Sequence, residues 1–201
     1  MRKRILLFGG SFNPPGRHHR ALVEKLIPYF DEIVIIPCGP RPDKSTVAEV
    51  LPIHRGEMTK LAFTGLPRVR VELFDILENK FTRTWALQKM FESEGEIWHL
   101  VGTDWTLGGE FGESEIHKVW QRGPELWKTL NFAVTNREDF PYHPEDLPPH
   151  HRFFRLGING SSSEIRKRIR GNKPITHLVA PEVGEYISRH GLYGRKEANM
   201  K

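Results

Sequence analysis

Short apolar runs of strand length alternate with segments of helical periodicity along the first two thirds of this 201-residue chain. Apolar residues recur at helical spacing over residues 17–29, 49–64, 82–93 and 114–127. The strand-like runs are Ile5–Phe8, Ile33–Pro37, Val69–Phe74, Ile97–Val101 and Phe132–Thr135. This alternation predicts a parallel sheet with helices on both faces. We therefore expect an α/β fold with a Rossmann-like parallel sheet, followed by a C-terminal helical segment.

The residues that follow the predicted strands mark where function is expected. In sheets of this kind, ligands bind beyond the carboxyl ends of the strands. The segments at those ends are Gly9-Gly10, Pro37 to Lys44, Gly102-Thr103-Asp104 and Asn136-Arg137.

We expect one domain over residues 1–194 and a polar tail at 195–201. Its parts are a parallel α/β core (1–137), a long loop (138–152) and a C-terminal segment with a strand and helices (153–194). The loop is rich in proline and histidine and follows neither a helical nor a strand period. Its histidines lack the spacing of metal ligands, so we predict no metal site in the protein itself.

The composition excludes several classes of protein. With 38% hydrophobic residues and a mean hydropathy of −0.49, the chain is typical of a globular protein. No apolar run approaches the roughly 20 residues of a membrane span, so we expect no membrane association. Cys38 is the only cysteine, which rules out an intrachain disulfide and favours a reducing compartment, the cytoplasm.

The net charge of +5 is mild for a nucleic-acid-binding protein. The densest basic cluster is Arg166, Lys167, Arg168 and Arg170, and a solvated helix face explains it as well as a binding surface does. No module that alternates aromatic and basic residues is present, so we expect no nucleic-acid partner. The oligomeric state stays open, and a homo-oligomer is compatible with the sequence.

The first turn, Gly9 to His19, has the chemistry of a phosphate site. Glycines let the backbone approach a ligand closely, and Pro14 and Pro15 suit a helix start. Free N–H groups and the helix dipole favour an anion there, and His19 lies where it can donate to a phosphate oxygen. The alternative is an ordinary strand–turn–helix corner with surface histidines.

A serine-rich helix start later in the chain suggests a second anion site. Ser161 with Glu164 fits a capping box, and Gly171 ends the predicted helix. Arg166 lies one turn in, with a guanidinium fork suited to phosphate. A plain capped helix is the alternative. Two such sites in one α/β chain favour a polyphosphate ligand.

Together these segments resemble the nucleotidyltransferase superfamily with its HxGH and ISSTxIR signatures. The resemblance rests on the turn that ends in His19, on Gly102-Thr103-Asp104, and on Ser161 to Arg166. Within the superfamily the chain is most similar to nicotinate or nicotinamide mononucleotide adenylyltransferases. Further matches run along the whole chain, at Pro37–Lys44, Arg55 with Met58, Thr82-Arg83-Thr84, Trp120 and the run from Leu178 to Tyr193.

The resemblance implies a reaction in which ATP and a pyridine mononucleotide give the dinucleotide and pyrophosphate, as a step of NAD biosynthesis. It implies that His19 contacts the α- and β-phosphates. Lys44 and Arg166 would hold the triphosphate and the leaving pyrophosphate. Ser162 and Ser163 would bind the β- or γ-phosphate. Mg²⁺ would bridge the phosphates, held mainly by ATP and water.

The resemblance also assigns the two ends of the substrates. Gly102 and Asp104 would hold the adenosine, with Asp104 on the ribose hydroxyls. Thr84 would meet the pyridine carboxylate or amide through its backbone, and Trp120 would stack on the ring. Further residues that we expect at the site are Gly9, Gly10, Ser11 and Phe12 for ATP, Asn13 and Arg137 for the mononucleotide, and His18 beside the reacting phosphate.

One position departs from the signature. In HxGH the first histidine falls at Gly16 and the glycine at His18, whereas this chain has the two exchanged. Loss of one oxyanion donor typically costs on the order of 10²–10³ in rate. Three outcomes are open: His18 supplies the missing donor from another direction, Arg17 does so, or catalysis is crippled and the protein only binds nucleotide.

Two other functions therefore compete with the leading one. A sister nucleotidyltransferase acting on pantetheine phosphate or a polyol phosphate is disfavoured by the serine-rich arginine motif and by Trp120. A catalytically weak nucleotide-binding or regulatory homologue is the alternative that Gly16 and His18 leave open. The preference for an acid or an amide mononucleotide is also open.

Overall fold

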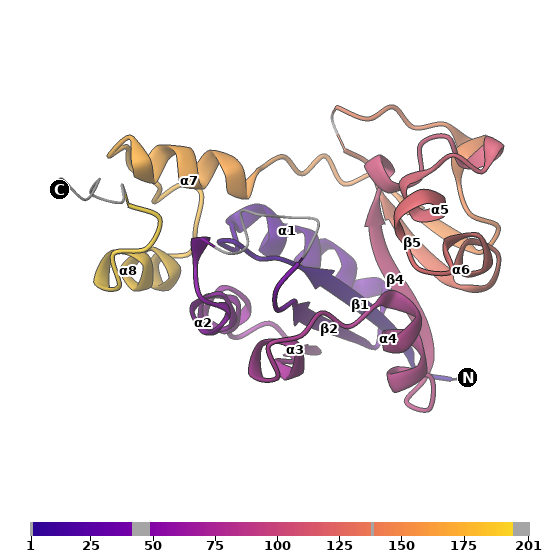
Figure 1. Ribbon diagram of the computed structural model, residues 1–201, viewed down its shortest axis with the longest axis horizontal. Coiled ribbons are helices and arrows are strands. Elements are labelled where there is room, and N and C mark those ends of the chain that lie inside the picture. Colours follow the sequence, from indigo (N-terminus) through magenta and orange to yellow (C-terminus); the bar gives the residue numbers. More distant parts are fainter. Residues whose placement is uncertain (1, 42–48, 138, 195–201) are drawn as a thin grey trace, which may run out of the picture.

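The computed structural model describes residues 2–41, 49–137 and 139–194. Within them, six parallel strands form a sheet in the order β3-β2-β1-β4-β5-β6, which confirms the expected fold class (Figure 1). The strands are β1 (Arg4–Gly10), β2 (Glu32–Pro37), β3 (Val69–Val71), β4 (Glu96–Gly102), β5 (Asn131–Thr135) and β6 (His151–Phe154). The strand order reverses between β1 and β4, so the carboxyl ends of these two strands flank a crevice in which ligands bind.

In the described part of the chain, six helices lie between the strands, and α7 and α8 follow the last strand. The helices are α1 (Arg17–Leu26), α2 (Pro52–Phe63), α3 (Phe74–Leu77), α4 (Thr84–Phe91), α5 (Glu115–Val119), α6 (Gly123–Thr129), α7 (Ser162–Arg170) and α8 (Pro181–Arg189). Short 3₁₀ turns lie at Ile27–Tyr29, Thr103–Trp105, Gly109–Phe111 and Pro144–Asp146. Across the described ranges, every helix is too short or too polar to cross a lipid bilayer.

Three predicted elements differ from the structure. The helix expected over 114–127 is two helices, because Arg122 is left-handed (φ 64°) and Pro124 lies in the first turn of α6, where its missing N–H is not needed. The third strand ends at Val71, and Phe74 begins α3. The strand expected in the segment 153–194 is β6, and it begins two residues earlier, at His151, inside the segment expected to be a loop. β6 is only four residues long and lies at the sheet edge, so no alternation marks where it begins.

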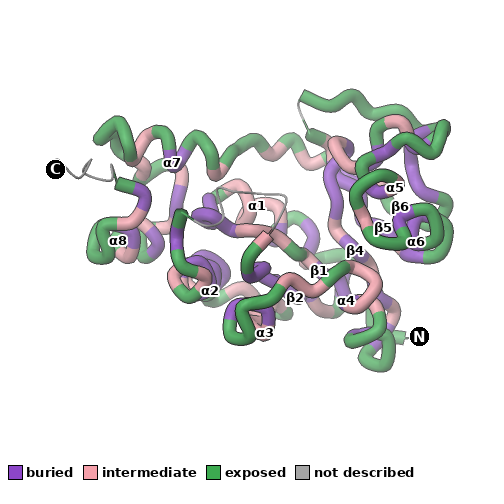
Figure 2. Tube along the Cα trace, in the orientation of Figure 1, coloured by how far each residue is buried: buried purple, intermediate pink, exposed green. Residues whose placement is uncertain are grey.

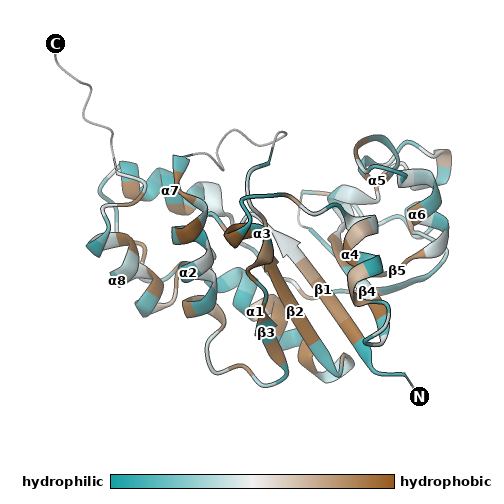
Figure 3. Ribbon diagram, turned by 60° about the horizontal axis from the view of Figure 1, so that its bottom comes forward, coloured by the Kyte–Doolittle hydropathy of each residue, from teal (hydrophilic) through white to brown (hydrophobic). Residues whose placement is uncertain are grey.

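Apolar layers cover both faces of the central strands. Successive residues of a strand point to opposite faces, so Leu6 and Ile33 join a large cluster with α1 and α2 on one face. Ile5 and Leu7 face the other side, where Leu87 of α4 covers them. Figure 3 shows β1 and β2 as strongly apolar ribbons, in keeping with strands buried on both faces.

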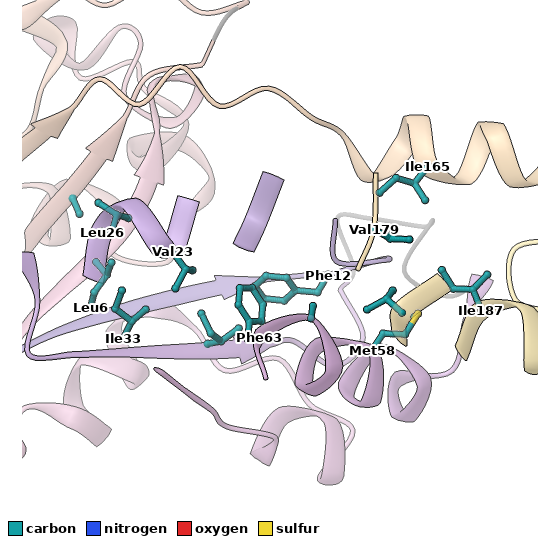
Figure 4. Close-up of a cluster of buried hydrophobic side chains, with 14 of the residues drawn as sticks. Leu6, Phe12, Val23, Leu26, Ile33, Met58, Phe63, Ile165, Val179 and Ile187 are labelled. Carbon is teal, nitrogen blue, oxygen red and sulfur yellow. The ribbon is translucent and has the colours of Figure 1, made fainter. Parts of the chain in front are cut away.

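The C-terminal helices belong to the larger cluster. The apolar cluster that holds Phe12 and Phe63 also includes Ile165 of α7, Ile187 of α8 and, just before α8, Val179 (Figure 4). The connection from β6 to α7, residues 155–161, is exposed or half-buried, whereas the inner sides of α7 and α8 are buried (Figure 2). This packing brings the start of α7 beside the turn that follows β1.

Candidate active site

The turn after β1 presents a histidine with a defined hydrogen-bonding state. Gly16 is the N-cap of α1, with extended backbone (φ −106°, ψ 170°). Its N–H donates to Nδ1 of His19 at 3.0 Å, and the N–H of His19 donates to the carbonyl of Gly16 at 3.0 Å. Because Nδ1 accepts a hydrogen bond, the proton of the neutral ring resides on Nε2. His19 therefore offers an N–H donor from Nε2.

His18 and His19 form a pair of neutral imidazoles. Their ring centroids are 3.9 Å apart and their planes are tilted by 38°. Burial, and then the charge of Arg137, lower the pKa of His18 to about 4. Burial lowers the pKa of His19 well below its usual value, with further contributions from His18 and Arg137. At neutral pH both rings are hydrogen-bonding groups, and positive charge has to come from neighbouring arginines.

The C-terminal part of the chain holds this turn in place. The hydroxyl of Ser162 donates to the carbonyl of Pro14 at 2.8 Å, and Nη1 of Arg166 donates to the carbonyl of Asn13 at 2.7 Å. The hydroxyl of Tyr193 donates to Oδ1 of Asn13 at 2.7 Å. Burial raises the pKa of Tyr193, which keeps its hydroxyl protonated as a donor. The two expected phosphate segments are thus in direct contact.

Arg166 is buried, unlike the other members of its basic cluster. Besides its bond to the turn, its Nη2 donates to Oγ of Ser163 at 3.1 Å. Its Nε is buried without a hydrogen-bond partner, and Glu49 lies 3.9 Å from that atom. Ser161 caps α7 by accepting from the N–H of Ser163 at 3.1 Å. The Arg166 guanidinium therefore lies in direct contact with the turn that follows β1.

The carboxyl ends of β4 and β5 complete the site. Nε of Arg137 lies 3.3 Å from Oδ1 of Asp104, and the Arg137 N–H donates to Oγ1 of Thr103 at 3.0 Å. A Cβ at Gly102 would fall 2.3 Å from Oδ1 of Asp104, so only glycine fits beside this pair. Because the Arg137 charge acts on both His18 and His19, the structure brings these expected residues together with the first turn.

A separate pocket of about 90 Å³ brings Thr84 and Trp120 together. The indole rings of Trp105 and Trp120 have centroids 5.8 Å apart at one side of it. Its lining residues are Arg41, Phe81, Arg83, Thr84, Trp105, Val119, Trp120 and Gln121. The guanidiniums of Arg41 and Arg83 lie 5.2 and 5.1 Å from the centroid of the Phe81 ring. The pocket has aromatic walls and two cations, and none of the described residues that line it is acidic.

Two buried polar groups that sequence reasoning gave no role support these parts. Arg55 is fully buried and donates to the carbonyls of Ser11, Cys38 and Gly39, at 2.9, 2.6 and 3.0 Å. It thereby ties the loop after β1 to the loop after β2. The carboxylate of Asp75 accepts from the backbone N–H and the hydroxyl of Thr82, just before the pocket. Burial raises the pKa of Asp75.

The remaining predicted residues take different places. Lys44 lies outside the described residues. The side chains of Phe12 and Asn13 are buried, 2% and 3% exposed, and they anchor the turn from within. A Cβ at Gly9 would meet no atom within 4 Å, so the backbone there borders open space. The ligand roles expected for Ser11, Asn13 and their neighbours stay predictions.

Among the described residues, no group of three or more histidine, cysteine, aspartate or glutamate side chains is placed to hold a metal ion. Asp104 at the carboxyl end of β4 pairs with Arg137.

Comparisons with known proteins agree with this geometry. The cytidylyltransferase-like family model matches residues 7–168. A probable nicotinate-nucleotide adenylyltransferase of Acidothermus cellulolyticus is 30% identical, and the match covers 98% of this chain and 97% of the relative. The nicotinate-nucleotide adenylyltransferase of Bacillus subtilis is 27% identical, with 95% and 98% covered.

A solved structure shares the fold. The Plasmodium falciparum nicotinic acid mononucleotide adenylyltransferase complexed with NaAD superposes with a TM-score of 0.76, at 22% identity, over 95% of this chain and 97% of that one. Family model, relatives and fold all point the same way. The chain belongs to the cytidylyltransferase-like family and, within it, to the nicotinate-nucleotide adenylyltransferases.

Proposed function

We propose that this protein transfers the adenylyl group of ATP to nicotinate mononucleotide, which yields the dinucleotide and pyrophosphate. One observation carries the proposal: the first turn, the start of α7 and the Asp104–Arg137 pair meet at one edge of the sheet. The pocket around Trp120 adds a place for an aromatic ring. The curated relatives carry the name of this activity.

In this reaction a phosphate oxygen of the mononucleotide forms a bond to the α-phosphorus of ATP. The bond from that phosphorus to the bridging oxygen breaks, and pyrophosphate leaves with the electron pair. The protein contributes no covalent step, so its task is to align the two phosphates and to neutralise developing charge.

We assign the donors as follows. Nε2–H of His19 donates to a phosphate oxygen at the reacting centre, since its other nitrogen is already engaged by Gly16. Arg166 supports the triphosphate with its charge and by holding the carbonyl of Asn13. The α7 hydroxyls of Ser162 and Ser163 and the side chain of Lys44 are proposed as further contacts to the β- and γ-phosphates.

The far ends of the substrates are assigned to the remaining groups. The adenosine lies against Gly102, with Asp104 on the ribose hydroxyls. We place the pyridine ring in the pocket with Thr84 and Trp120. Arg137 neutralises the mononucleotide phosphate, because its charge acts on both imidazoles.

A divalent cation, Mg²⁺, accompanies ATP in this proposal. The described residues lack a ligand cluster of their own, which fits an ion held by phosphate oxygens and water. The ion would neutralise phosphate charge as pyrophosphate departs.

The pocket favours an acidic ring substituent over an amide. Arg41 and Arg83 line the pocket, each close to the Phe81 ring, and a carboxylate gains from such cations whereas a neutral amide does not. This charge pattern supports nicotinate, rather than nicotinamide, mononucleotide as the acceptor. We place the reaction in the cytoplasm, where ATP and mononucleotide are available.

The test is pyrophosphate release from ATP and Mg²⁺ with nicotinate mononucleotide, compared with nicotinamide mononucleotide and pantetheine phosphate. We expect turnover with nicotinate mononucleotide in large excess over the other two. As a matched variant, Trp120→Ala should raise KM for the mononucleotide and leave KM for ATP nearly unchanged. ATP binding by calorimetry without turnover on any acceptor would refute the proposal and favour a nucleotide-binding homologue.

A further inference from the structure

His18 lies in a slot that two glycines leave open. A Cβ at Gly16 would fall 2.6 Å from both Cε1 and Nδ1 of the His18 ring. A Cβ at Gly160 would fall 2.5 Å from Cγ and 2.6 Å from Cβ and Nδ1 of the same residue. Real side chains essentially never approach so closely, so any residue other than glycine at either position displaces the imidazole.

The slot is assembled from distant parts of the chain. Gly16 precedes α1, whereas Gly160 lies just before α7 and has a φ of +154°, which few residues other than glycine adopt. The hydrogen bond from Ser162 to Pro14 fixes these two segments against each other. The position of the His18 ring therefore depends on the same contact that joins the two phosphate segments.

The ring in this slot is poised for a ligand. It stacks on His19 with centroids 3.9 Å apart and is half-buried. Among the described residues, no group forms a hydrogen bond or an ion pair with it. The edge that carries Nδ1 faces the two glycines, so Nε2 lies on the opposite edge.

We propose that His18 is a second phosphate-binding imidazole of the active site, and that Gly16 and Gly160 are positioning residues that hold it against His19. This inference rests on the proposed function. In its terms, the departure at Gly16 and His18 is an exchange of positions, because the ring of residue 18 fills the space that a side chain of residue 16 would enter. The site then retains two neutral N–H donors for the reacting phosphates.

The decisive experiment is an exchange of the two residues. His18→Gly should lower kcat on the order of 10²-fold, since one oxyanion donor is lost. Gly16→His alone should lower it at least as far, because two rings then compete for one slot. The double variant, with both substitutions, should recover to within about tenfold of the wild type. A double variant as poor as the product of the singles would overturn the proposal.

Two further measurements separate this role from a merely structural one. Gly160→Ala should impair kcat far more than Gly157→Ala, although both replace a glycine of positive φ in the same segment. A Cβ at Gly157 meets nothing within 4 Å, so it carries the backbone strain without the collision. In NMR titrations the His18 ring should ionise near pH 4 in the wild type and nearer 6.5 in Gly160→Ala.

The outcomes also distinguish failure of the inference from failure of the proposed function. If the wild type turns over no acceptor, the proposed function fails. Binding to His18 is then tested by NMR, by following the His18 ring signals while a non-hydrolysable ATP analogue is added. Signals that move in the wild type and stay fixed in Gly160→Ala support it, and signals that stay fixed in both refute it. Equal effects of Gly157→Ala and Gly160→Ala on turnover would likewise count against it.

Discussion

Arg55→Met should loosen the active site without touching a substrate. Arg55 is fully buried, and its guanidinium donates to three carbonyls in the loops after β1 and β2. A buried carbonyl left without a donor costs about 1–3 kcal/mol, so losing three is severe. Removal of the buried charge itself offsets part of this, because desolvating a guanidinium is costly. We expect a net loss of about 3 kcal/mol in the free energy of unfolding.

Thermal unfolding measures this loss. For a domain of this size, 1 kcal/mol corresponds to about 2–4 °C in Tm, which predicts a fall of about 6–12 °C. The loop after β1 carries the phosphate turn, so KM for ATP should rise by about tenfold in protein that is still folded. Arg55→Lys is the matched control, since it keeps a charge but reaches fewer carbonyls, and it should be intermediate in both measurements. A fall below about 2 °C with unchanged KM would refute this account.

Three shorter predictions address the pocket around Trp120, the contact of Arg166 with the turn after β1, and the stability of the fold in acid. Arg83→Gln should lower kcat/KM for nicotinate mononucleotide by about tenfold while leaving the value for nicotinamide mononucleotide unchanged, in parallel steady-state assays; equal losses would disprove charge selection. Arg166→Ala should weaken ATP binding in calorimetry by about 10–100-fold, because charge beneath the turn and the bond to Asn13 are lost together, and unchanged affinity would remove Arg166 from the site. His99 is buried and has its pKa lowered from 6.5 to about 4 by burial, so the unfolded chain binds its proton more readily and stability declines as pH falls from about 6.5 to 4. The His99 shift contributes about 3 kcal/mol to the free energy of unfolding that is lost over this range. Unfolding measured against pH should therefore show a shallower decline in stability for His99→Gln than for the wild type.

Local patterns predicted most of the fold, for a physical reason. Strands buried on both faces form unbroken apolar runs, and β1, β2, β4 and β5 all lie where such runs occur. β6 is a four-residue edge strand whose register comes from pairing with β5, and no local pattern encodes that pairing. The break between α5 and α6 did have a local signal, Pro124, which the apolar periodicity on either side outweighed.

In the site, too, local features could be predicted from the sequence, whereas those that depend on distant residues could not. Glycine turns and the serine cap are local features, so the sequence alone locates the two expected phosphate segments, and the structure shows them in contact. The contact of Asn13 with a ligand stays a prediction, and in the structure its carbonyl and side chain accept hydrogen bonds from Arg166 and Tyr193. Which way a turn residue points depends on partners some 150–180 positions away, and no sequence window holds that information. The same holds for Gly160, whose importance appears only beside the His18 ring.

The hydrogen bonds from the C-terminal part of the chain to the turn after β1 have a consequence for folding during synthesis. Residues 13–17 leave the ribosome before their hydrogen-bond partners at Ser162, Arg166, Leu178 and Tyr193 have been synthesised. Until then, β1 and α1 can form and pack while the carbonyls of Asn13 and Pro14 have only water as a donor. The bonds that hold the turn therefore form later in synthesis than β1 and α1, and a chain that lacks residues 162–193 lacks these bonds to Asn13 and Pro14.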